Sequence, residues 1–173
     1  NIWERNYEME IRLHYIEQGE GFPLILLHGN GEDHTYFKRQ MEPFADHFRV
    51  IAVDTRGHGE SPRGTGPFTL SRFAEDLKSF FDQHGISKCH LLGFSDGGNV
   101  ALLFALKYPD RVERLILNGA NLDPCGVKLK TQIPIVLGWG LCRLCALFSQ
   151  QAKQNWEMLN LMVTQPHIHR AEL

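Results

Sequence analysis

A glycine–serine–glycine pattern constrains this chain more than any other feature of its sequence. Gly93, Ser95 and Gly97 are spaced as G-x-S-x-G, directly after the apolar run Cys89–Gly93 and directly before residues with helical spacing. A serine on so tight a strand-to-helix turn leaves no room for side chains two residues before or after it, and glycine avoids the clash. The pattern therefore predicts a strand, a sharp bend and a helix, with the Ser95 hydroxyl presented at the bend.

Three further apolar runs have the same character, because each is continuous rather than alternating and is bounded by polar residues or glycine. Strands that are covered on both faces look like this. Amphipathic stretches lie between the runs, so the order is βαβαβαβ, which predicts an α/β fold with a mostly parallel sheet and helices on both faces. The runs are Leu24–His28, Val50–Asp54 and Leu115–Asn118, and the helical stretches cover 36–44, 70–81 and 99–108.

Local signals refine these expected elements. Thr69 is placed to cap the start of the second helix, and Gly85 to stop it. Glu10–Ile16 alternates polar and apolar residues, which predicts an outer antiparallel strand.

The chain is expected to have three parts. Residues 1–120 carry the strand pattern and form the core; residues 121–165 hold helical stretches without a strand and form a helical segment over the sheet; residues 166–173 lead into a further core strand. The run Leu115–Asn118 would then be an apolar sheet edge, which natural proteins cover. We expect further chain, or association with another copy, to cover it.

The bend predicts nucleophilic chemistry at Ser95. It places the serine at a helix N-terminus, where unpaired N–H groups favour developing negative charge. Two backbone amides could hold an oxyanion, one from Asp96 and one from Asn30 in the glycine-rich loop His28-Gly29-Asn30-Gly31. His28 is expected to fix this loop by hydrogen bonds, whereas Asp54 and Arg56 are expected to brace the turn after the second run by charge-assisted contacts.

Together these motifs resemble the α/β-hydrolase superfamily. His28-Gly29-Asn30-Gly31, Asp54-x-Arg56-Gly57-x-Gly59-x-Ser61 and Gly93-x-Ser95-x-Gly97 occur in the order and spacing of that superfamily, and Ser95-Asp96-Gly97-Gly98 is similar to small esterase-like members of the valacyclovir hydrolase type. The resemblance implies that residues 121–165 begin a helical cap. It also implies a triad acid and histidine beyond Leu173; a substitute set of Asp123 with His167 or His169 is disfavoured.

Composition narrows the function classes. A formal charge of −2 excludes a basic nucleic-acid footprint, and the apolar stretch Ile133–Phe148 is too short for a membrane span. Scattered histidines and the isolated Cys142-x-x-Cys145 pair predict no metal or cofactor, and four cysteines suggest reduced thiols in the cytoplasm.

The leading hypothesis is a serine hydrolase that cleaves ester or related acyl bonds of a small, partly apolar substrate. A carbon–carbon bond hydrolase or a cofactor-free haloperoxidase of the same fold is an alternative. The rival from another class is an inert binding protein that lacks the full triad.

Overall fold

The computed structural model describes residues 11–65, 67–121, 129–147 and 149–164. The chain divides into two compact units, Asn1–Ala120 and Asn121–Leu173. The residues predicted to lead into a further strand, 166–173, lie outside the described part.

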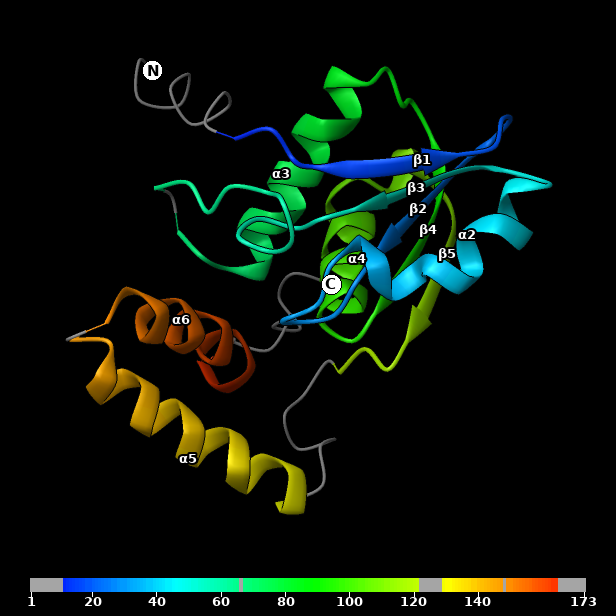
Figure 1. Cartoon of the computed structure of the whole chain (residues 1–173). Helices are drawn as coiled ribbons and strands as arrows, with labels where there is room; N and C mark the ends of the chain where they lie inside the picture. Colours follow the sequence, from blue (N-terminus) through cyan, green and yellow to red (C-terminus); the bar gives the residue numbers. More distant parts are fainter. Residues whose placement is uncertain (1–10, 66, 122–128, 148, 165–173) are drawn as a thin grey trace. The chain divides into compact units, whose positions relative to one another are not determined.

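One five-stranded sheet forms the first unit, in the order β1-β3-β2-β4-β5 (Figure 1). Strand β1 pairs antiparallel with β3, whereas β2–β3, β2–β4 and β4–β5 are parallel. The α/β prediction of a mostly parallel sheet is therefore confirmed. The strands are β1 (Tyr15–Gln18), β2 (Pro23–Leu27), β3 (Arg49–Val53), β4 (Cys89–Phe94) and β5 (Val112–Asn118).

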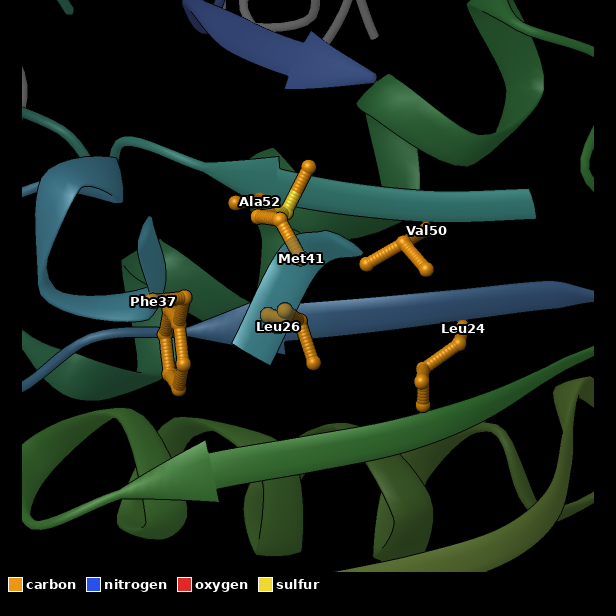
Figure 2. Packing of buried hydrophobic residues seen from close by; sticks show 6 residues of the cluster. All are labelled: Leu24, Leu26, Phe37, Met41, Val50 and Ala52. Atoms are coloured by element: carbon orange, nitrogen blue, oxygen red, sulfur yellow. The ribbon is translucent and has the colours of Figure 1, made fainter. Parts of the chain in front are cut away.

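Helices cover both faces of this sheet (Figure 1). On one face, Phe37 and Met41 pack with Leu24, Leu26, Val50 and Ala52 of β2 and β3 (Figure 2). The residues that alternate with these in β2 and β3 point to the opposite face and are equally buried, which explains why the strands are continuously apolar. The helical elements are η1 (His34–Phe37), α2 (Lys38–Ala45), α3 (Leu70–Gln83), α4 (Asp96–Lys107) and η2 (Pro109–Arg111).

The predicted ends of α3 are confirmed. The Thr69 side chain accepts a hydrogen bond from the Arg72 N–H, as an N-cap residue does. Gly85 follows the helix with a φ of 64°, a conformation that glycine adopts without a Cβ penalty. The sequence signals at both ends therefore act through the backbone hydrogen bonds of the helix.

Several predicted boundaries were wrong, including the start of β5, which lies at Val112 rather than Leu115. The first strand begins at Tyr15 rather than near Glu10, because its length is set by the four residues that pair with β3. The helix after the serine begins at Asp96 rather than Asn99, so the bend is tighter than expected. The helix after β2 begins with a 3-10 turn, η1, which the apolar spacing alone does not reveal.

Strand β5 lies at an edge of the sheet and pairs with β4 among the described residues. Its Ile116 and Leu117 side chains are 48% and 42% exposed, so apolar surface is present at this edge. What covers the edge remains a prediction.

Helices α5 (Leu129–Cys145) and α6 (Gln150–Thr164) pack against each other in the second unit. The Trp139 indole N–H of α5 donates to the Asn160 Oδ1 of α6 at 3.1 Å, and the Arg143 guanidinium lies over the Trp139 ring. Leu137 and Leu141 of α5 are 69% and 63% exposed. No helix in the described part of the chain is long and apolar enough to cross a membrane.

Candidate active site

Ser95 occupies the bend between β4 and α4 with φ 52° and ψ −120°. Of the residues that the structure describes, no other non-glycine residue has a positive φ. Such a conformation costs on the order of 1–3 kcal/mol and persists only where the surroundings impose it. Here the Ser95 N–H donates to the Asn118 carbonyl at 2.8 Å, and the Gly98 N–H donates to the Ser95 carbonyl at 2.9 Å. Ser95 is partly exposed, not in the core.

The glycines around Ser95 are sterically required. A Cβ on Gly93 would overlap the backbone carbonyl of Gly97, as the spacing predicted. A Cβ on Gly97 would instead overlap the carbonyl oxygens of Leu27 and His28. The second glycine therefore permits the start of α4 to pack against the end of β2, a contact that the motif does not reveal by itself.

The loop after β2 reaches the serine through Gly29. A Cβ on Gly29 would lie 3.2 Å from the Ser95 Cβ and 3.2 Å from the Phe94 ring. Glycine thus allows the backbone of this loop to approach the bend closely. Asp96 is the first residue of α4, and its N–H belongs to the amides that have no acceptor within a helix. The structure therefore brings together the two segments that carry Asn30 and Asp96.

The Asp96 carboxyl is buried beside the serine. Burial raises its pKa above the ordinary value, and hydrogen bonds from the Asn30 and Asn99 side chains offset this rise only in part. The Asn99 Nδ2 donates to Oδ1 at 3.4 Å, whereas Oδ2 has no hydrogen-bond partner among the described residues. The site thus holds a carboxyl group with one unused acceptor.

His28 is committed to hydrogen bonds within the loops. The Thr55 N–H donates to its Nε2 at 3.0 Å, so Nδ1 carries the proton and donates to the Gly29 carbonyl at 2.8 Å. Burial lowers the pKa of His28 and favours this neutral form. Both ring nitrogens are occupied, which fits a structural role.

Asp54 and Arg56 brace the loop after β3 with partners that the sequence did not indicate. The Arg56 guanidinium makes two hydrogen bonds to Asp76 of α3, at 2.7 and 2.8 Å, with no exposed surface. Asp54 accepts from the Nδ1 atoms of His14 and His34 at 2.8 and 3.0 Å.

His14, His34 and Asp54 form a group whose donor atoms lie within 4.8 Å of one another, the spacing of metal ligands. The Asp54 carboxylate also accepts backbone N–H bonds from His34 and Glu60, so the protein already supplies donors to both of its oxygens. Burial alone would raise the pKa of Asp54, but these bonds outweigh it and hold the pKa below its ordinary range. Hydrogen bonds within the protein therefore satisfy both oxygens of the Asp54 carboxylate.

No histidine hydrogen-bonds to the Ser95 hydroxyl within the described residues. Asp123, His167 and His169, the disfavoured substitutes, lie outside that part of the chain.

Comparisons with known proteins agree on one family. The model of the alpha/beta hydrolase fold matches residues 23–140. The 2-hydroxy-6-oxononadienedioate/2-hydroxy-6-oxononatrienedioate hydrolase of Escherichia coli K12 is 36% identical over 155 residues, which cover 86% of this chain and 52% of that protein. Epoxide hydrolase 4 of Mus musculus is 40% identical over 111 residues, which cover 62% of this chain and 31% of that protein. The chain therefore spans about half of the length of the first of these relatives and less of the second.

Solved structures show the same fold. A thermophilic esterase from Thermogutta terrifontis aligns with a TM-score of 0.67 and 29% identity, over 90% of this chain and 63% of that one. An epoxide hydrolase from Bacillus megaterium aligns with a TM-score of 0.71 over 94% of this chain and 72% of that one; at 19% identity, it supports the fold alone.

Proposed function

Because the chain belongs to the α/β-hydrolase family, we propose that it carries the nucleophile of a serine hydrolase that cleaves ester or related acyl bonds. The observation that carries the proposal is the backbone of Ser95, a hydroxyl-bearing residue held at φ 52° and ψ −120° at the start of α4. Strained backbone of this kind is concentrated at functional sites in proteins. Presentation of a nucleophile at the bend would account for the strain at Ser95.

In the proposed reaction the Ser95 Oγ attacks the substrate carbonyl carbon and forms a tetrahedral intermediate. Its oxyanion is held by the backbone N–H groups of Asn30 and Asp96, and one such donor contributes about 3 kcal/mol to transition-state stability. The triad histidine takes the serine proton and returns it to the leaving group as the acyl–enzyme forms. We propose that this histidine and its acid partner lie outside the described residues.

An aromatic surface beside the bend supports a partly apolar substrate. The Phe94 ring precedes Ser95 and stacks on the Tyr36 ring, with centroids 4.5 Å apart and planes inclined by 13°. Tyr36 is 38% exposed. An acyl group next to Ser95 would therefore meet aromatic carbon from the core unit itself.

The serine at the bend bears on which of the relatives' reactions this chain could share. Epoxide hydrolase chemistry of the aspartate-nucleophile type is disfavoured, because the bend carries serine. A second candidate, hydrolysis of a carbon–carbon bond in an oxo-dioate, is favoured by the relative from Escherichia coli, which matches 86% of this chain. A panel of p-nitrophenyl esters and 2-hydroxy-6-oxo-dienoates separates the two reactions.

The test of the nucleophile is covalent labelling of the full-length protein with a fluorophosphonate. We expect one adduct on Ser95, loss of labelling in Ser95→Ala, and a fall in kcat/KM of about a thousandfold or more. Ser87→Ala, at an exposed site in the loop before β4, is the control and should label normally. Labelling that survives Ser95→Ala would defeat the assignment of Ser95, whereas a protein that the probe labels nowhere would support the inert binding protein instead.

A further inference from the structure

Glu32 closes the loop that approaches the serine. The Gly29 N–H donates to the Glu32 Oε2 at 2.9 Å, and the Glu32 N–H donates back to the Gly29 carbonyl at 3.2 Å. These two bonds fix both ends of the four-residue turn that contains Asn30. Glu32 is only partly buried, so this reciprocal pairing, rather than burial, sets its position.

The Glu32 carboxylate and Ser95 both lie next to Gly29. A Cβ on Gly29 would stand 2.9 Å from the Glu32 Oε2 and 3.2 Å from the Ser95 Cβ, so Gly29 separates the carboxylate from the serine. The Gly29 amide is already used by Glu32. It cannot donate to an oxyanion at the same time, which leaves that task to the amides that follow it in the loop.

We propose that Glu32 is a positioning residue for the oxyanion loop. Its carboxylate holds the Gly29 N–H, which lies one peptide before the Asn30 N–H, and so anchors the start of the turn, while the Glu32 N–H holds the Gly29 carbonyl of the peptide that carries the Asn30 N–H. The inference rests on the proposed function of Ser95. Donors stabilise an oxyanion only when they are held in place before the charge develops, and a misplacement of about 1 Å can cost up to about 100-fold in rate.

Positioning of the loop by Glu32 can be distinguished from two other roles, proton transfer and stabilisation of the fold. A carboxylate near a developing oxyanion opposes it electrostatically, so charge is not the useful property of Glu32; the useful property is an acceptor at the right distance. If Glu32 instead transferred a proton, the neutral amide of glutamine would fail. If it only stabilised the fold, its loss would change melting temperature and active fraction without changing the kcat of the folded enzyme.

Three variants of the full-length protein test the proposal with p-nitrophenyl acetate. Glu32→Gln keeps an acceptor at the same reach and should retain kcat within about twofold. Glu32→Ala removes the acceptor, and Glu32→Asp shortens it by one methylene; both should lower kcat about 10-fold with KM within about twofold, because oxyanion donors act in the transition state. Melting temperatures and fluorophosphonate titration of active sites correct for unfolded protein.

Asp33→Ala is the matched control. Asp33 is the adjacent acid and accepts from the Thr35 N–H at 2.8 Å at the start of η1, so its loss perturbs the same segment without touching Gly29. It should leave kcat per active site unchanged. A normal kcat in both Glu32→Ala and Glu32→Asp, or a Glu32→Gln variant as slow as Glu32→Ala, would overturn the inference. Failure of the proposed function is distinct, because the wild type would then not be labelled at Ser95.

Discussion

The side chains of Asn30 and Asp96 share a hydrogen bond that joins the loop after β2 to the first turn of α4. The backbone amides of the same two residues are the proposed oxyanion donors. Displacement of one segment would therefore strain a bond to the other. The side-chain contact ties together two donors that come from parts of the sequence more than sixty residues apart.

The pKa of Asp96 should rise further when Asn30 is replaced. Burial raises this pKa, and the hydrogen bonds from Asn30 and Asn99 lower it, so Asn30→Ala and Asn99→Ala should each move it upward. Carboxyl-carbon NMR during a pH titration measures the value directly. Asp33 is the internal reference, since its hydrogen bonds to Thr35 lower its pKa. An Asp96 that titrates at or below its ordinary 3.8 in the wild type contradicts the prediction.

Stability should fall as the solution is acidified below pH 6.5, because His58 is buried and uncharged. Burial, and then repulsion from His28, lowers the pKa of His58 to about 4. The unfolded chain, with the ordinary value, binds the proton first. Between pH 6.5 and about 4 the native state therefore loses stability, by about 3 kcal/mol in total for this group.

Urea unfolding at several pH values checks this loss, with His58→Asn as the comparison. Asparagine cannot titrate, and its amide can replace the Nδ1 donor that reaches the Arg56 carbonyl at 3.0 Å. The acid dependence should become shallower but not vanish, since burial also lowers the pKa of His28. An equal slope in both proteins would refute the assignment to His58.

Replacing Arg56 by alanine should destabilise the protein by about 3–5 kcal/mol, because it leaves the buried Asp76 carboxylate without its two strongest hydrogen bonds. Arg49→Ala removes a pair of similar geometry between Arg49 and Glu17 that is about a third exposed. That control should cost no more than about 1 kcal/mol. Equal losses in the two variants, measured by chemical denaturation, would show that burial does not decide the outcome.

Gly93→Ala should cost about 2–3 kcal/mol or more, because the new methyl group overlaps the backbone of Gly97 and neither segment can yield easily. Gly85→Ala provides the comparison. Gly85 has a positive φ of 64°, but no atom lies within 4 Å of a Cβ added there. Its replacement should therefore cost only about 1 kcal/mol of backbone strain. Thermal unfolding of both variants measures the difference; equal costs would contradict the steric explanation.

The sequence predicted those parts of the fold that are set by residues close together in the chain. Burial on both faces of the sheet gives β2 and β3 their continuous apolar runs, and steric crowding at the bend requires the glycines around Ser95. The pairing of Arg56 with Asp76, and of Asp54 with His14 and His34, could not be read, because each depends on how distant segments meet. Glu32 was detectable in principle: a glutamate three residues after Gly29 suits a reciprocal turn bond.

The backbone of Ser95 has a consequence for what its replacement would do to stability. Glycine would adopt a φ of 52° at far less cost than serine, so Ser95→Gly relieves local tension while it deletes the hydroxyl. If Ser95 is the nucleophile as proposed, Ser95→Gly therefore yields a protein that is more stable and inactive at once.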